Sequence, residues 1–229
     1  RGSLDAAGQY LPVQGFTNLD GKTIDVDRNG VAATIDGNSL QEYYGNLLFT
    51  GTNEANGVNA GNDTIDGGDG DDWIAGGGGN DVIKGGNGSD IIWGGSGNDN
   101  IKGEAGDNWI DGGYGDDTIT ASEGDDEIYS GDGKDNINAG HGNNKIYAGG
   151  DNDIVNSGVG EDYIEAGDGD DTVNSGIGND VVKGGSGADL IKAGTGNDSV
   201  VGGLGNDELY GEDGSDTIEG DEGDDLIYG

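Results

Sequence analysis

The nine residues Gly85-Gly86-Asn87-Gly88-Ser89-Asp90-Ile91-Ile92-Trp93 set the pattern for most of the chain. From Val58 to Tyr228 the sequence divides without a break into nineteen nine-residue units with the consensus G-G-x-G-x-D-x-U-x, where U is aliphatic. The eighth position is aliphatic in every unit, and the fourth is Gly in all but one, where Asp151 stands. A fixed period held over this length indicates a repeat architecture.

The sixth position of the unit carries an acidic residue almost throughout. It is Asn at Asn108 and Asn144, and it is Asp in the other seventeen units: Asp63, Asp72, Asp81, Asp90, Asp99, Asp117, Asp126, Asp135, Asp153, Asp162, Asp171, Asp180, Asp189, Asp198, Asp207, Asp216 and Asp225. Carboxylates and the carbonyls of Gly-rich turns are hard oxygen ligands suited to calcium. Asp and Gly also mark ordinary turns, but turn formation alone would not hold the nine-residue phase.

This nonapeptide resembles the repeat of the RTX family, secreted bacterial proteins with haemolysin-type calcium-binding repeats. The resemblance covers residues 58–229. It implies an all-β, right-handed parallel β-roll, a β-solenoid with two nonapeptides per coil. The first six residues of a unit would form a turn and the last three a short strand. Calcium would bind between successive turns.

Local stereochemistry is consistent with a roll. Gly at the first, second and fourth positions permits backbone angles closed to other residues. Strand alternation turns the eighth side chain inward and its neighbours outward, and units eighteen residues apart would stack about 4.8 Å apart. The sixth-position residues then form two columns, one running from Asp63 to Asp225 and the other from Asp72 to Asp216.

The composition requires a counter-charge. The chain has 229 residues, with 54 Gly, 30% apolar residues, no Cys and a net charge of −38. Low hydrophobicity with high charge predicts disorder unless cations neutralise the chain. Ten turns in one column and nine in the other leave at most about seventeen gaps for calcium. We therefore expect folding only when calcium binds.

Two positions weaken the expected calcium sites. Asn108 and Asn144 lie in the same column, and each borders two gaps between turns. An amide keeps a carbonyl oxygen but has no charge, so four sites should be weak or empty. Lys145 and His141 in the unit around Asn144 further disfavour a cation.

The outward faces of the two sheets are expected to differ. One carries an aromatic residue on six consecutive rungs: Trp73, Trp93, Trp109, Tyr129, Tyr147 and Tyr163. These rings either bind a glycan or a protein partner or stack to stabilise the sheet; we favour stacking. The opposite face carries Thr118, Thr120, Asn136, Asn138, Asn156, Thr172 and Asn174. Its mixed residues argue against ice binding.

Residues 1–57 break the repeat and are expected to form an irregular, β-rich cap on the roll at residues 58–229. Short strands are predicted at Thr23–Val26, Val31–Ile35 and Leu47–Phe49, and one helical turn at Ser39–Tyr44. The run from Asp25 to Gly30, with Asp36, resembles half of an EF-hand-type loop. It lacks the final Glu and flanking helices, so a hairpin at Asn29-Gly30 is preferred.

The sequence favours a calcium-binding, calcium-induced folding module with a structural or adhesive role. The resemblance implies type I secretion and an extracellular or cell-surface location. It also implies a C-terminal secretion signal, which does not follow Tyr228, so a larger parent protein is expected. The alternatives are the non-catalytic module of a secreted enzyme or toxin, and a glycan-binding module. The acidity argues against nucleic acid, no transmembrane run occurs, and no catalytic constellation is evident.

Overall fold

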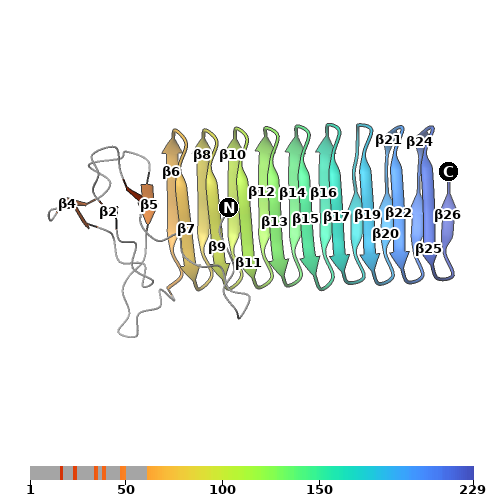
Figure 1. Ribbon diagram of the computed structural model, residues 1–229, viewed down its shortest axis with the longest axis horizontal. Coiled ribbons are helices and arrows are strands. Elements are labelled where there is room, and N and C mark those ends of the chain that lie inside the picture. Colours follow the sequence, from red (N-terminus) through yellow and green to blue (C-terminus); the bar gives the residue numbers. More distant parts are fainter. Residues whose placement is uncertain (1–15, 18–22, 25–33, 36–37, 40–46, 50–60) are drawn as a thin grey trace.

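The structure is a computed structural model. It describes residues 61–229 throughout, together with five short strands at residues 16–17, 23–24, 34–35, 38–39 and 47–49. The described residues contain strands and turns but no helix. From β6 onward the strands stack side by side along one axis as a β-solenoid (Figure 1). The predicted all-β, parallel repeat fold is therefore confirmed.

Two parallel ten-stranded sheets make up the two sides of the roll. Sheet 1 contains β6 (Thr64–Asp69), β8 (Val82–Asn87), β10 (Asn100–Ala105), β12 (Thr118–Glu123), β14 (Asn136–His141), β16 (Ile154–Val159), β18 (Thr172–Asn174), β20 (Leu190–Lys192), β23 (Glu208–Tyr210) and β26 (Leu226–Tyr228). Sheet 2 contains β5 (Leu47–Phe49), β7 (Trp73–Gly78), β9 (Ile91–Ser96), β11 (Trp109–Tyr114), β13 (Glu127–Asp132), β15 (Lys145–Gly150), β17 (Tyr163–Asp168), β19 (Val181–Ser186), β22 (Ser199–Leu204) and β25 (Thr217–Glu222). The pair β21 (Thr195–Gly196) and β24 (Asp213–Gly214) lies beside them.

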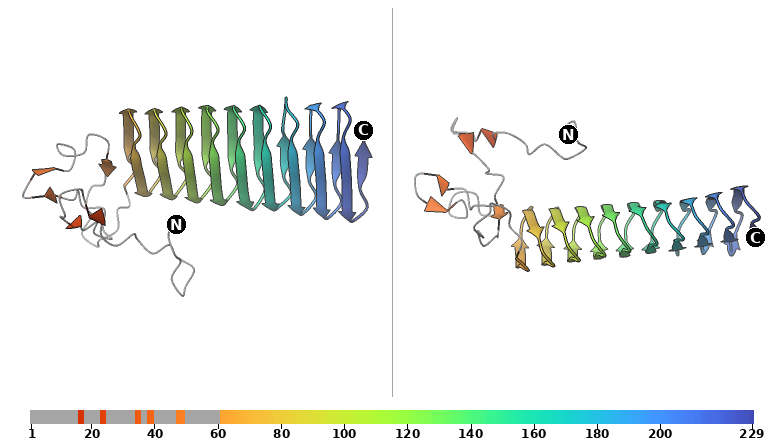
Figure 2. Two further views of the ribbon diagram at one scale, coloured as in Figure 1. Left: turned by 45° about the horizontal axis from the view of Figure 1, so that its top comes forward. Right: turned by 90° about the horizontal axis from the view of Figure 1, so that it is seen from below.

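The register confirms two nonapeptides per coil. Ile101 in β10 pairs with Ile83 in β8 and Ile119 in β12, a shift of eighteen residues in each case. The eighth-position side chains point inward and are 0–2% exposed from Ile65 to Leu209. The core is therefore one column of eighth-position aliphatic side chains per sheet, together with buried first-position alanines such as Ala121 and Ala148. Figure 2 shows the stacked coils from two further sides.

Most strands are longer than the sequence predicted. They span six residues, from the seventh position of one unit to the third position of the next, as in β12. The strand bends at the second position, where Gly131 has φ +110° and Gly113 has φ +105°. The turn is correspondingly shorter than the six residues expected.

The reason for Gly at the first position also differs from the prediction. No left-handed angle occurs there; instead, a Cβ on Gly112 would lie 2.6 Å from both Asp117 Oδ2 and the carbonyl oxygen of Ser130. The narrow space beside the sixth-position carboxylate explains why the first position carries a small residue. Where Ala or Ser stands at this position, as at Ala121 and Ser130, the side chain is fully buried.

Before the roll, the strands pair differently from the expected hairpin. β1 (Phe16–Thr17) pairs antiparallel with β2 (Thr23–Ile24), and β3 (Thr34–Ile35) pairs with β4 (Asn38–Ser39). Ser39 is therefore in a strand rather than the expected helical turn. The EF-hand-type segment and Asn29-Gly30 lie outside the described residues.

The strand β5 joins sheet 2 in parallel beside β7, with Leu47 opposite Trp73. A strand at Leu47–Phe49 is thus confirmed, and it continues sheet 2 beyond the first complete coil. The role of residues 1–57 as a separate cap remains a prediction.

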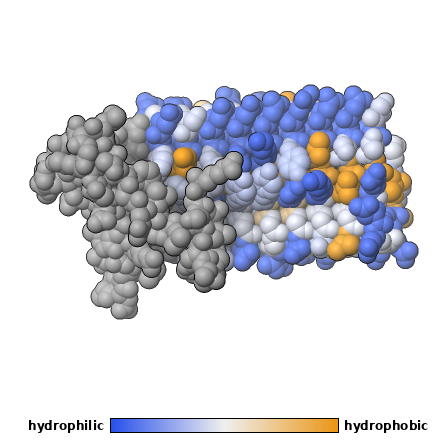
Figure 3. Space-filling view, viewed as in Figure 1, coloured by the Kyte–Doolittle hydropathy of each residue, from blue (hydrophilic) through white to orange (hydrophobic). Residues whose placement is uncertain are grey.

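The face of the roll seen in Figure 3 carries both hydrophilic and hydrophobic residues. Figure 3 shows hydrophilic residues along one edge and hydrophobic ones gathered toward the C-terminal coils, where Leu204, Leu226 and Ile227 are 53%, 55% and 49% exposed. Among the described residues, no helix is long and apolar enough to cross a membrane.

Candidate metal sites

The sixth-position residues lie in the turns just before the strands, in the two predicted columns. One column precedes the strands of sheet 1 and the other those of sheet 2. All are buried, at 1–3% exposure, except Asp63, Asp216 and Asp225, which are half-buried. The fold therefore withdraws a long row of carboxyl groups from water, which is costly unless each finds a partner.

In every buried sixth-position carboxyl group except that of Asp72, one oxygen has a hydrogen-bond partner. Asp117 Oδ1 accepts a hydrogen bond from the backbone N–H of Asp99, one coil earlier, at 2.7 Å. The N–H of Asp117 in turn donates to Asp135 Oδ1 at 2.8 Å. The same bond repeats from coil to coil in both columns, so the sixth-position side chains tie each turn to the next.

The second oxygen has none. Fourteen Asp side chains bury an Oδ2 atom without any hydrogen-bond partner: Asp72, Asp81, Asp90, Asp99, Asp117, Asp126, Asp135, Asp153, Asp162, Asp171, Asp180, Asp189, Asp198 and Asp207. A buried polar atom without a partner is rare in folded proteins. Its systematic recurrence indicates a missing positive partner rather than a local defect.

The surroundings of Oδ2 support this interpretation. The point where a Cβ on Gly112 would stand is 2.6 Å from Asp117 Oδ2 and 2.6 Å from the Ser130 carbonyl oxygen. Both of these oxygens are acceptors, and Asp117 Oδ2 receives no hydrogen bond from the described residues. A proton or a cation is needed to make the arrangement favourable.

Without a cation, the carboxyl groups hold their protons more tightly than usual. Burial raises the pKa of Asp117 to about 7, and repulsion from Asp99 and Asp135 adds to the rise. Burial likewise raises the pKa of Asp153 and Asp189 to about 7. Such shifts arise when several carboxylates share a low-dielectric region without a counter-ion.

These donors fit calcium. Within residues 61–229, no cluster of three or more His, Asp or Glu side chains could hold an ion, so a site here needs main-chain carbonyls as well. Asp Oδ2 atoms from neighbouring turns and the carbonyls of the Gly-rich turns would hold calcium, which accepts six to eight oxygens in flexible geometry. The bound ion would supply the positive charge that the carboxyl oxygens lack.

The side chains of Asn108 and Asn144 have a hydrogen-bond partner for both of their polar atoms. Asn108 Nδ2 donates to the Gly106 carbonyl at 2.9 Å, and Asn144 Nδ2 donates to the Gly142 carbonyl at 3.1 Å. Their Oδ1 atoms still accept the N–H of the turn before, from Asp90 and Asp126. Neither side chain has an unsatisfied atom. The amide group therefore supplies the donor that the Asp positions lack, in keeping with the predicted weak sites.

A second ladder, at the fifth position, was not predicted. Asn80 Oδ1 accepts the N–H of Asn98, and Asp125 Oδ1 accepts that of Asn143, one coil later in each case. This direction is opposite to that of the sixth-position ladder. The signal was present in the sequence, because fourteen of the nineteen fifth positions are Asn or Asp. The consensus had treated this position as unspecified.

The six aromatic residues predicted to share a face form one continuous row on sheet 2. The ring centroids of successive residues lie 4.8–6.2 Å apart, from the edge-to-face pair Trp73 and Trp93 to Tyr147 and Tyr163. Tyr129 and Tyr147 are stacked, with 9° between their planes. These contacts favour the stabilising interpretation, and binding of a ligand there remains a prediction.

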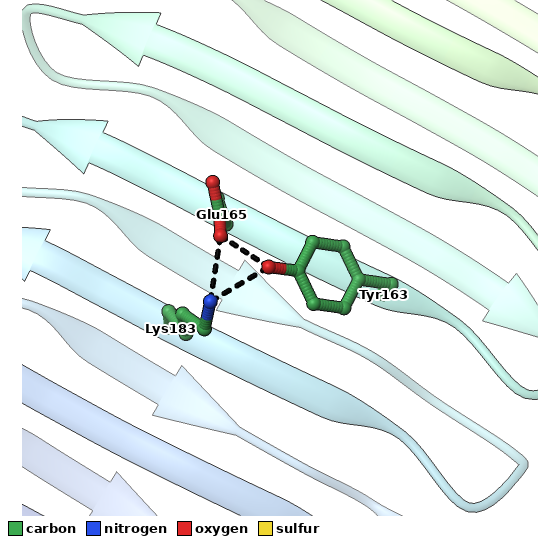
Figure 4. Close-up of polar contacts among 3 residues, drawn as sticks. All are labelled: Tyr163, Glu165 and Lys183. Atoms are coloured by element: carbon green, nitrogen blue, oxygen red, sulfur yellow. Dashed lines mark hydrogen bonds and ion pairs between the residues drawn. The ribbon is translucent and has the colours of Figure 1, made fainter.

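Polar contacts end the aromatic row (Figure 4). Lys183 Nζ lies 5.1 Å from the centre of the Tyr163 ring and 2.7 Å from both Tyr163 Oη and Glu165 Oε1. Tyr163 also donates to Glu165. The hydrogen bond from Lys183 lowers the pKa of Glu165. Tyr163, the last ring of the row, thus has its hydroxyl group hydrogen-bonded to neighbouring side chains of the same sheet.

Comparison with known proteins agrees with this geometry. The model of the RTX calcium-binding nonapeptide repeat matches the chain in overlapping segments that together run from residue 58 to residue 229. No curated protein matches the chain.

Proposed function

Because the chain belongs to the RTX calcium-binding nonapeptide repeat family, we propose that it is the calcium-dependent folding module of a secreted bacterial protein. In that protein it would have a structural or adhesive role. The observation that carries the proposal is the row of fourteen buried Oδ2 atoms without a partner. Once deprotonated, these oxygens need a positive partner, so the roll and its ions form together.

The proposed location follows from the same requirement. A chain with a net charge of −38 repels itself, so it stays extended where calcium is scarce and folds where calcium is plentiful. This difference suits a protein that crosses a secretion conduit unfolded and becomes ordered outside the cell. The module itself is proposed to be non-catalytic, since its buried carboxyl groups recur alike on every coil and form no singular site.

Circular dichroism in the far ultraviolet tests the proposal directly. The chain at pH 7.5 in a chelator should lack strand signal, and added calcium should produce it in a cooperative transition. Magnesium should fail, because it needs tight octahedral geometry and retains its water. Full strand signal in the chelator at this pH would refute the proposal.

A further inference from the structure

One strip of sheet 1 lacks acidic residues. On seven consecutive strands of sheet 1, from β8 to β20, the seventh and ninth repeat positions both face outward and lack Asp and Glu, although Glu104, at the outward second position on β10, borders them. We call these fourteen residues the acid-free strip: Val82, Lys84, Asn100, Lys102, Thr118, Thr120, Asn136, Asn138, Ile154, Asn156, Thr172, Asn174, Leu190 and Lys192. Register pairing places them side by side in rows along the roll.

Acidic residues are missing from the strip but not from the equivalent positions of sheet 2. The chain contains 47 acidic residues, and the corresponding outward positions of sheet 2, from β7 to β19, include Asp111, Glu127 and Glu165. Those sheet 2 positions also carry Lys145 and Lys183, whereas the strip holds Lys84, Lys102 and Lys192 with no acidic residue among its fourteen members. The strip therefore carries a net positive charge, and the corresponding positions of sheet 2 do not.

The polar side chains of the strip have unused hydrogen-bonding capacity. Within residues 61–229, none of its Asn amides or Thr hydroxyls forms a side-chain hydrogen bond. In contrast, the aromatic face satisfies Tyr129 with Glu127 and Tyr163 with Glu165. Asn138, Asn156 and Asn174 occupy the same position on adjacent strands. They present a row of donors and acceptors spaced about 4.8 Å apart.

The dimensions of the strip restrict its partner. Seven strands span about 29 Å and three strand residues about 10 Å, so the strip measures roughly 300 Å². A stable protein interface covers about 800 Å² on each partner, which makes a folded protein a poor fit. A narrow, straight surface suits an extended linear chain.

We propose that the acid-free strip binds an extended anionic polysaccharide. Carboxylate or sulfate groups of the polysaccharide pair with Lys84 and Lys102 near one end and with Lys192 near the other. Its hydroxyl groups exchange hydrogen bonds with the Asn and Thr side chains between them. Three Lys residues are too few for nucleic acid, which is bound through many phosphate contacts.

This inference depends on the proposed function in one respect. The strip exists only in the folded roll, and the neighbouring turn columns repel an anion until calcium neutralises them. Binding should therefore be measured in saturating calcium, after circular dichroism has shown that each variant is folded. A folded protein that does not bind contradicts the inference alone, whereas loss of calcium-dependent folding contradicts the proposed function.

Isothermal titration calorimetry with a galacturonic acid hexamer tests the inference. The wild-type roll should bind this hexamer but not uncharged maltohexaose. The double variant Lys84→Gln and Lys102→Gln should bind about fivefold to tenfold more weakly. The matched double variant Lys134→Gln and Lys145→Gln, which removes two exposed charges outside the strip, should bind like the wild type.

A second pair of variants adds charge instead. Asn138→Asp and Asn156→Asp together should reduce binding of the acidic hexamer, whereas Asn143→Asp and Asn152→Asp, in the exposed turns, should not. Equal affinity of both Lys double variants would show that calcium bridges the sugar to the acidic turns, and the inference would then be wrong. Equal binding of maltohexaose, or no binding of either sugar, would also overturn it.

Discussion

At the scale of the residue, we expect the difference between an aspartate and an asparagine to determine whether a turn needs a metal ion. Both side chains accept the N–H of the preceding coil through Oδ1. The second atom differs: Asp117 buries an oxygen without a partner, while Asn108 places an N–H group on the carbonyl of Gly106. A change of one atom converts an electrostatic cost into a hydrogen bond.

Exchanging these two residue types should change the number of bound ions. Asp117→Asn should bind about two fewer calcium ions, one for each gap that Asp117 borders, and Asn108→Asp should bind about two more. Equilibrium dialysis with metal analysis measures the ratio of calcium to protein. Asp116→Asn is the control, because its exposed side chain removes the same charge outside the buried column. An unchanged ratio in both variants would exclude the sixth-position side chains as ligands.

Glycine at the second position relieves a left-handed backbone angle, although Glu104, Ser122, Glu212 and Asp221 also have positive φ at this position in other units. Gly131 has φ +110°, and an added Cβ would collide with the carbonyl oxygen of Gly113. Gly131→Ala should therefore destabilise the calcium-loaded roll by at least about 1–2 kcal/mol. Gly150→Ala is the matched control, since its Cβ would approach only Asp132 Oδ1, at 3.8 Å. Urea denaturation in calcium compares the two variants, and equal midpoints would contradict the argument.

At the scale of the element, each turn column behaves as one chain of coupled acids. Burial, assisted by repulsion from Asp99 and Asp135, raises the pKa of Asp117 to about 7. A carboxyl group whose pKa is raised on folding stabilises the folded state while it is protonated. That contribution is complete below the unfolded pKa of about 4 and is lost as the pH rises through about 6 to 7. Protons and calcium therefore compete for the same oxygens.

Acid should partly replace calcium. In a chelator, the chain should show more strand signal by circular dichroism at pH 5 than at pH 8, because Asp117, Asp153 and Asp189 are protonated at the lower pH. The calcium concentration at half-folding should be higher at pH 6 than at pH 8. Metal-free spectra that do not change between pH 5 and 8 would contradict the raised pKa values.

The aromatic row should stabilise the sheet on which it lies. Tyr147 contacts Tyr129 and Tyr163, with centroids 4.8 and 6.0 Å away. Tyr147→Ala should lower the free energy of unfolding in calcium by about 1–3 kcal/mol. Asn138→Ala, at an outward position of the opposite sheet, is expected to have little effect. If both variants unfold at the same urea concentration, ring stacking does not explain the row.

At the scale of the whole molecule, stability comes from repetition rather than from a thick core. The core is one column of eighth-position aliphatic residues per sheet with a few small alanines beside it, and each coil contacts only its neighbours, as in other solenoids. A net charge of −38 opposes compaction on so small a core. Calcium binding and collapse should therefore be a single event.

Small-angle X-ray scattering can measure that collapse. An unfolded chain of 229 residues has a radius of gyration of about 50 Å, and charge repulsion should increase it further. Saturating calcium should reduce the radius to less than half of that value. A compact particle in the chelator at neutral pH would show that the roll does not depend on metal for its shape.

The sequence was sufficient for the architecture but not for every detail. The phase of Ile101 and Ile119 predicted the eighteen-residue coil, because aliphatic side chains at one repeat position can be buried only if the units stack. Six-residue strands could not be predicted, since the bend at Gly131 depends on the neighbouring coil. The pairing of Leu47 with Trp73 spans twenty-six residues instead of eighteen, and no repeat phase extends there to indicate it.

The sites were predictable to the same extent. The position of Asp117 in a buried column follows from the repeat. That Oδ1 accepts a hydrogen bond while Oδ2 has no partner depends on contacts between coils, which the sequence does not give. The donor role of Asn108 toward Gly106 is similarly a matter of three-dimensional geometry. The fifth-position ladder was not predicted for another reason, because the consensus leaves that position unspecified.

Because of the eighteen-residue register, alternate nonapeptides lie on opposite sides of the roll. Odd-numbered nonapeptides supply one sheet and even-numbered ones the other, so removal of a single nonapeptide moves every later unit to the opposite side. Deletion of residues 112–120 would leave Trp73, Trp93 and Trp109 in place but transfer Tyr129, Tyr147 and Tyr163 across the roll, and the downstream Asn row would follow the tryptophans instead. Changes in length that preserve both faces must therefore come in pairs of units.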